Sequence, residues 1–225
     1  MRVSISRQSI APGLCALLVA TMWSATAVAA NLGQKDDFEA TLGGWQVGSA
    51  GTGGSPTLQT TGGPSGAGDG YMRLNSTGGI GALSKLVVFN QSSWGGPYTS
   101  FGAISMDLAN LGQSTVQMRI ALTDTSGGVF IYEDPIVLPP DGQWRDALFV
   151  LDPGNFTNGA NFATGRNNIR EIRILHSASA GSIVGDTFAA TVGVDNIEAV
   201  VIPEPGTAFL VAVGAVALWG RRHRA

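Results

Sequence analysis

The sequence predicts an all-β domain built as a two-sheet antiparallel sandwich. Short runs of alternating apolar and polar residues recur along the chain, with Gly, Ser, Asn and Pro between them. Between residues 31 and 201, no stretch sustains the apolar repeat of about 3.6 residues that an amphipathic helix requires. About nine or ten strands without interleaved helices are typical of two sheets packed face to face.

Each strand is predicted from its own pattern. The plainest run covers residues 115–123, where four apolar side chains alternate with polar ones, as in a half-buried antiparallel strand. In the run 103–108, the apolar side chains alternate in the same way and are predicted to face inward. Further strands are predicted at 71–74, 83–89, 143–151, 169–175 and 192–201, and one helical turn near 158–164.

The N-terminal segment, residues 1–30, has the three parts of a secretory signal peptide. Arg2 and Arg7 supply the positive charge, residues 10–19 are mainly apolar, and small residues follow at 25–30. This pattern predicts a signal helix, handled by the export machinery and cut by signal peptidase after Ala29 or Ala30. The single cysteine lies in the apolar part, so the mature chain has no cysteine. An exported domain without disulfides must be held by its core, by a metal ion, or by both.

The C-terminal segment, residues 202–225, also has three parts. A Pro-Glu-Pro motif occupies 202–207, and its prolines end the folded domain by about Val201. An uncharged apolar stretch predicts a transmembrane helix at 208–220, although its apolar run is shorter than the roughly 17 residues of a permanent span. A basic end at 221–225 completes the segment. The residues of this pattern are Pro203, Glu204, Pro205, Arg221, Arg222 and Arg224.

This order of motif, short apolar helix and basic end resembles the PEP-CTERM sorting tail of bacterial proteins. The resemblance covers about a tenth of the chain and implies recognition by an exosortase-type membrane transpeptidase. It also implies a transient stay in the inner membrane, followed by delivery to the cell surface or extracellular matrix. Retention as a membrane anchor is the alternative.

The domain between these segments is acidic. From residue 31 to 202 the chain has eight Lys or Arg and fifteen Asp or Glu. Nucleic acid and anionic lipid surfaces are therefore not expected partners.

Several motifs of the domain follow one another in an order known from jelly rolls. They include Asp37-Phe38-Glu39 before Gly44-Trp45, and Asp195-Asn196-Ile197 in the last strand. In this order they are similar to modules of the galactose-binding-like, laminin-B and carbohydrate-binding kinds. The resemblance implies a jelly-roll topology, and such scaffolds carry many functions.

Three acidic residues are candidate metal ligands. The first and last strands of a jelly roll can lie side by side, which would bring Asp37 or Glu39 close to Asp195. Carboxylates and backbone carbonyls gathered at one rim suit Ca²⁺. We therefore predict a structural calcium site, with solvated strand ends as the alternative.

Aromatic residues flanked by amides are the candidate sugar contacts. Sugar rings stack on aromatic faces while their hydroxyls meet polar side chains. The turn-rich segment 90–98 has this composition, and we predict contacts from Trp94, Tyr98 and Asn90. Trp45 and Trp144 are predicted to pack in the core.

Catalysis has little support in the sequence. His176 is the only histidine of the domain, no Gly-x-Ser-x-Gly turn is present, and the mature chain has no cysteine nucleophile. The sequence therefore predicts a non-catalytic structural protein that is associated with the envelope or exopolysaccharide and contacts matrix glycans. A dedicated lectin-like module is the first alternative. A hydrolase or lyase that uses paired carboxylates is the second.

Overall fold

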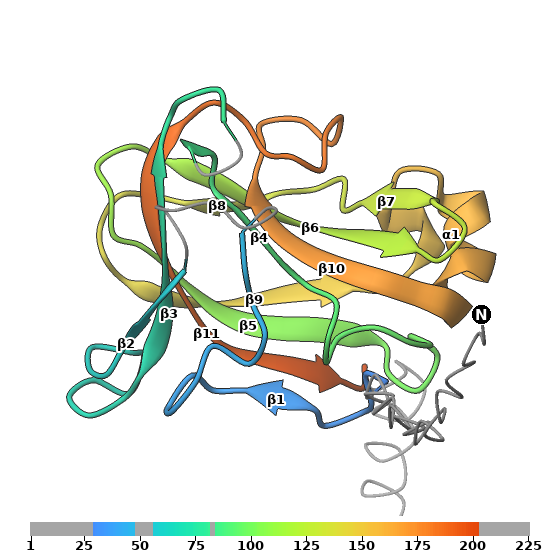
Figure 1. Cartoon of the computed structure of the whole chain (residues 1–225), viewed down its shortest axis with the longest axis horizontal. Coiled ribbons are helices and arrows are strands. Elements are labelled where there is room, and N and C mark those ends of the chain that lie inside the picture. Colours follow the sequence, from blue (N-terminus) through green and yellow to red (C-terminus); the bar gives the residue numbers. More distant parts are fainter. Residues whose placement is uncertain (1–28, 48–55, 82–83, 203–225) are drawn as a thin grey trace, which may run out of the picture.

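The computed structural model describes residues 29–47, 56–81 and 84–202, which form two antiparallel sheets packed face to face (Figure 1). The predicted all-β sandwich is confirmed. The signal segment before Ala29 and the tail beyond Ile202, with Pro203, Glu204, Pro205 and the three arginines, lie outside the described residues. Within the described ranges, no helix is both long and apolar enough to cross a membrane.

Eleven strands and one short α-helix make up the described residues. They are β1 (Lys35–Asp36), β2 (Thr57–Gln59), β3 (Tyr71–Thr77), β4 (Val87–Asn90), β5 (Ala103–Asn110), β6 (Val116–Asp124), β7 (Val129–Ile131), β8 (Ile136–Leu138), β9 (Trp144–Val150), α1 (Gly159–Gly165), β10 (Ile169–His176) and β11 (Ala189–Val200).

The last strand organises the six-stranded sheet. The strand order is β2-β3-β11-β5-β9, and β1 also pairs with β11. One edge of β11 meets β5, while its other edge meets β3 and then β1, where Lys35 pairs with Glu198. The register shifts between Asp195 and Glu198, and Asn196 has φ 49° there. The first and last strands therefore lie side by side, as expected for the jelly roll.

The second sheet has five strands in the order β4-β10-β6-β7, with β8 also paired to β6. Alternate side chains of β5 and β6 fill the space between the sheets, and the inward residues of both strands are those that the sequence predicts. They are Ile104, Met106 and Leu108 of β5, and Val116, Met118, Ile120 and Leu122 of β6. Each fully buried aliphatic side chain stabilises the fold by about 1.5–3 kcal/mol.

The outer face of the five-stranded sheet is partly covered by the β10–β11 loop, residues 177–188. Ala180 and Ile183 of this loop pack on a second apolar cluster that includes Leu175 of β10. The guanidinium of Arg119 fixes the loop, because Nε donates to the carbonyl of Ser177 at 3.0 Å. This part of the sheet face is therefore closed to a ligand.

Candidate functional site

The structure corrects the predicted sugar contacts. Trp94, Tyr98 and Asn90 are all 0% exposed. A sugar ring stacks only on an aromatic face that it can reach. These three side chains therefore cannot form the binding surface that the sequence predicts.

The two buried tryptophans share one carboxylate. Asp36 Oδ2 accepts hydrogen bonds from the indole of Trp45 at 2.7 Å and from that of Trp94 at 2.8 Å. The Tyr98 hydroxyl donates to the carbonyl of Trp94 at 2.6 Å, and burial raises the pKa of this phenol. The segment 90–98 is thus held inside the fold by its own polar groups.

Asn90 closes the turn that precedes Trp94. Its Oδ1 accepts from the backbone N–H groups of Ser92 at 2.9 Å and Ser93 at 3.0 Å, and its Nδ2 donates to Gly43 O at 2.9 Å. The side chain is fully engaged in the loop, which explains its burial.

The core prediction for the remaining tryptophans is right for Trp45 and wrong for Trp144. Trp45 is buried, whereas Trp144 lies partly exposed on the outer face of the six-stranded sheet. There its ring meets Tyr71 edge-on at 5.3 Å and covers Gly193, whose missing Cβ would stand 2.7 Å from indole Cη2.

The predicted calcium ligands occupy different environments. Asp195 is buried, whereas Asp37 and Glu39 are exposed. Burial, with smaller contributions from the charges of Asp69, Asp107 and Glu39, raises the pKa of Asp195 to about 7. Within the described ranges, no three His, Cys, Asp or Glu side chains are placed to hold a metal ion. Calcium binding stays a prediction.

Two hollows lie at the end of the sandwich that carries α1. The first, of about 410 Å³, lies between α1 and the β6–β7 turn, and the second, of about 310 Å³, borders the 91–97 loop. Both are lined by Asn168. The first is also lined by Asp124, Ser126, Gly128, Phe130, Asn161, Thr164 and Gly165, and the second by Ala29, Gln91, Gly95, Gly96, Pro97, Thr125, Asn167, Ile169 and Arg170.

Asp124 occupies the first hollow with one oxygen free. The residue is 8% exposed, and its Oδ1 accepts from the backbone N–H groups of Ser126 at 2.8 Å and Gly128 at 2.7 Å. Among the described residues, Oδ2 has no hydrogen-bond partner. A Cβ at Gly128 or Gly165 would stand 2.7 or 2.8 Å from Oδ2, so the two glycines leave the space beside this oxygen open.

Helix α1 is held against the sandwich by aromatic packing. The ring of Phe162 stacks on that of Phe156 at 4.2 Å and meets Phe130 at 5.4 Å. At its first residue, Gly159 lies so close to the carbonyl of Pro153 that a Cβ would stand 2.1 Å from that oxygen. These contacts fix the wall of the first hollow.

Arg166 joins α1 to the loop beneath the second hollow. Its Nε donates to the carbonyl of Tyr98 and its Nη1 to that of Leu151, each at 2.9 Å. Gly96 and Ile169 exchange both backbone hydrogen bonds beside it, at 2.6 and 3.0 Å. The two hollows therefore belong to one braced end of the molecule.

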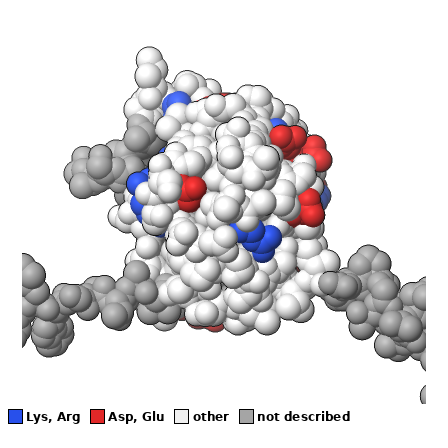
Figure 2. Space-filling model, turned by 90° about the vertical axis from the view of Figure 1, so that its right-hand side faces the viewer, with Lys and Arg blue, Asp and Glu red and all other residues white. Residues whose placement is uncertain are grey.

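Uncharged residues form most of the surface at this end (Figure 2). Asp124 is the only charged residue that lines the first hollow, and Arg170 is the only one that lines the second. The remaining polar groups are amides and hydroxyls. Such groups both donate and accept hydrogen bonds, as sugar hydroxyls require.

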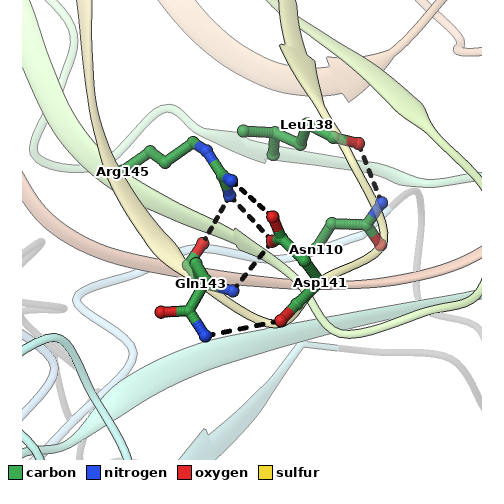
Figure 3. A network of polar contacts seen from close by, with 5 residues as sticks. All are labelled: Asn110, Leu138, Asp141, Gln143 and Arg145. Atoms are coloured by element: carbon green, nitrogen blue, oxygen red, sulfur yellow. Dashed lines mark hydrogen bonds and ion pairs between the residues drawn. The ribbon is translucent and has the colours of Figure 1, made fainter.

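The opposite end of the sandwich, around the β8–β9 turn, pairs its polar groups with each other (Figure 3). Arg145 forms an ion pair with Asp141 at 2.5 Å, and this hydrogen bond lowers the pKa of Asp141 to about 2. Gln143 N donates to Asp141 Oδ1 at 3.0 Å, and Asn110 Nδ2 donates to Leu138 O at 2.9 Å. We call this region the closed end and the α1 region the open end.

The hollows were not predicted as a site. The helical turn near 158–164 is predicted from the sequence, but its residues indicate no role for it. A signal for Asp124 existed, because an Asp followed by Thr, Ser, Gly and Gly is typical of a turn closed by the Asp side chain. No signal placed this turn beside α1.

Comparisons with known proteins give the fold. The sequence matches no protein-family model and no curated protein sequence, so the resemblance of the tail to PEP-CTERM rests on its residues alone. An exo-β-agarase structure aligns with a TM-score of 0.54 and 17% identity, over 74% of this chain and 24% of the agarase. A second agarase structure aligns with a TM-score of 0.50 and 14% identity, over 76% of this chain and 26% of the enzyme.

A carbohydrate-binding module, CBM28, specific for non-crystalline cellulose, aligns with a TM-score of 0.51 and 11% identity over 78% of this chain and 100% of the module. The chain thus matches the full length of a binding module but only about a quarter of each agarase. At these identities the comparisons show a shared fold.

Proposed function

We propose that this protein is an exported, non-catalytic carbohydrate-binding protein of the cell envelope or the surrounding exopolysaccharide. The observation that carries the proposal is the pair of adjoining hollows at the open end, in which most of the polar side chains are amides and hydroxyls. Their volumes, about 410 and about 310 Å³, fall in the range of roughly 300–1,000 Å³ for small-molecule sites. The fold shared with a carbohydrate-binding module supports the same function.

The carboxylates favour binding over hydrolysis. Asp124 is the only acidic residue that lines the first hollow, whereas glycoside hydrolysis uses two carboxyl groups about 5–9.5 Å apart. Asp107 and Asp146 are opposite each other in the pairing of β5 with β9, but they line neither hollow. Release of reducing sugar from a bound polysaccharide would instead establish the hydrolase alternative.

A glycan array tests the function. The purified protein should bind neutral polysaccharides, with agaro- and cello-oligosaccharides as the first probes, because the structural neighbours include agarases and a cellulose-binding module. A saturable preference for one glycan would make it a lectin-like module, and weak binding to many would make it a matrix component. Absence of binding to every glycan would refute the proposal.

Delivery by the sorting tail is part of the proposal and rests on Pro203, Glu204, Pro205 and the basic end. Mass spectrometry of the protein recovered from its own cells tests it. A mature C-terminus near residues 203–207 is the expected result of exosortase-type cleavage. Recovery of Arg221, Arg222 and Arg224 in the mature protein would indicate a retained anchor.

A structural Ca²⁺ is a separate proposal for the region of Asp195. This buried carboxylate forms no ion pair among the described residues, and the charge of Glu39 acts on it. The carbonyls of Phe38 and Gln59 both lie near Gly70, within 3.2 Å of the position of its missing Cβ. Two carboxylates with backbone carbonyls suit a calcium ion. Thermal unfolding with added Ca²⁺ and with EGTA should differ, and equal midpoints would exclude the ion.

A further inference from the structure

We propose that the open end binds two consecutive sugar units, the first of them neutral, with Asp124 as the anchor of the first unit and Asn168 as the contact shared by both. This inference rests on the proposed function and adds the class of sugar and the roles of individual residues. It starts from the unpaired oxygen of Asp124.

The free Oδ2 of Asp124 is an acceptor held in place before any ligand arrives. Oδ1 is fixed by the backbone N–H groups of Ser126 and Gly128, so the carboxylate loses little freedom on binding. Gly128 and Gly165 leave room beside Oδ2. An ionised carboxylate is the strongest acceptor that a side chain offers to a hydroxyl donor. Two neighbouring hydroxyls of one sugar can donate to it together.

The charge of the first hollow selects against acidic sugars. Asp124 is negative, and the other polar side chains of the hollow, Ser126, Asn161, Thr164 and Asn168, are neutral. A uronate or sulfate placed here would face a like charge without a cation among the lining residues. A neutral sugar instead finds a carboxylate, amides and hydroxyls.

The second hollow adjoins the first at Asn168 and fits the next unit of a chain. Its polar side chains are Gln91, Thr125, Asn167, Asn168 and the cation Arg170, so the selection against an acidic unit holds for the first hollow alone. Asn168 lines both hollows, and its amide carries two donor hydrogens and one acceptor oxygen. It can therefore contact adjacent units on either side of one glycosidic bond. A monosaccharide would use only the first hollow.

The substitution Asp124→Asn tests the anchor. Asparagine keeps Oδ1 for the two backbone N–H groups and replaces the negative Oδ2 by an amide nitrogen, so the turn is expected to remain. Isothermal titration with agaro- and cello-oligosaccharides of increasing length should give a Kd about 10- to 100-fold higher than for the unsubstituted protein. The matched control is Asp141→Asn at the closed end, which should leave Kd unchanged.

The substitution Asn168→Ala tests the shared contact. It should raise the Kd of disaccharides and longer chains about two- to tenfold, and that of a monosaccharide by a smaller factor, because a monosaccharide makes only one of the two contacts with Asn168. Circular dichroism and thermal unfolding of each variant show that the fold is retained.

The outcomes separate the inference from the function on which it rests. If the unsubstituted protein binds no glycan, the proposed function fails. If it binds glycans with equal affinity before and after Asp124→Asn, or prefers chains built of uronates alone, the function stands and this inference is overturned. An equal effect of Asn168→Ala on all chain lengths would overturn the two-unit arrangement.

Discussion

The two ends of the sandwich use similar polar residues in opposite ways. At the closed end, both oxygens of Asp141 accept from Arg145, and Gln143 N adds a third hydrogen bond (Figure 3). At the open end, Asp124 Oδ1 accepts hydrogen bonds from two backbone N–H groups, while Oδ2 has no partner among the described residues and lies beside the first hollow. Polar composition alone therefore does not locate a binding site. A polar group that lies beside a cavity and has no hydrogen-bond partner does locate one.

A second difference lies beneath the surface. The open end rests on the buried residues Trp94 and Tyr98 and on the guanidinium of Arg166, whereas Trp144 at the closed end is partly exposed. A site that is open to solvent is thus supported by a rigid interior.

The largest effect is expected for Trp94→Ala. Removing this fully buried ring leaves a cavity and deprives Asp36 of one of its two indole donors, so the free energy of unfolding should fall by about 3–5 kcal/mol. The matched substitution Trp144→Ala, at the partly exposed ring, should cost only about 1–2 kcal/mol. Urea denaturation measures both. Equal losses would remove this distinction between the ends.

Two arginines provide the next comparison. Arg166→Ala leaves the carbonyls of Tyr98 and Leu151 without the donors that Arg166 supplies. The free energy of unfolding, measured with urea, should therefore fall by about 2–4 kcal/mol. Arg145→Ala breaks an exposed ion pair and should have a much smaller effect. If Arg145→Ala lowers the free energy of unfolding more than Arg166→Ala does, the hydrogen bonds of Arg166 do not stabilise the open end as proposed.

The pH dependence of stability tests a histidine near the closed end. His176 Nδ1 accepts the backbone N–H of Gln117 at 2.9 Å, and burial lowers the pKa of the imidazole below its usual 6.5. The unfolded chain therefore takes up this proton at a higher pH than the folded one, so the contribution of His176 to the free energy of unfolding should fall as pH drops through about 6.5. Asp195 contributes with the opposite sign over this range, because its pKa is raised to about 7 in the folded state.

The variant His176→Gln removes this titration and isolates its contribution. Urea midpoints of both proteins, measured from about pH 7.5 to pH 5.5, should diverge as pH falls. Parallel curves would mean that the folded state tolerates the imidazolium.

The smallest effect concerns the mature N-terminus. Ala30 is 1% exposed and its N–H donates to the carbonyl of Gly95 at 2.8 Å, beside the second hollow. A chain that starts at Asn31 loses this hydrogen bond and a buried methyl group. Its free energy of unfolding should be about 1–2 kcal/mol lower than that of a chain starting at Ala30. Identical unfolding curves would show that Ala30 contributes nothing.

The long strands could be predicted because each has its own alternation of apolar and polar residues. The run 115–123 became β6, and the runs 103–108 and 169–175 lie within β5 and β10. The strands β1, β2, β7 and β8 were missed since two or three residues are too few to show a period. Their positions are set by partners elsewhere in the chain.

The candidate site could not be predicted from local composition. The surroundings of Trp94 read as an exposed turn, but the carboxylate that binds its indole lies 58 residues earlier in the sequence. The residues around Asp124 indicate a turn and no ligand contact, because the hollow beside this carboxylate is formed with α1 only in the folded chain. Burial and unpaired oxygens are properties of the tertiary structure.

The pairing of β1 with β11 has a mechanical consequence. β1 runs antiparallel to β11, with Lys35 opposite Glu198, so the described chain enters and leaves the sandwich at the same end (Figure 1). A pull on residues 29 and 202 in opposite directions therefore loads the hydrogen bonds of this ladder one after another instead of all together. Under such a force, β1 should detach from β11 first. The open end, where residues 29 and 202 lie, should therefore unfold before the closed end.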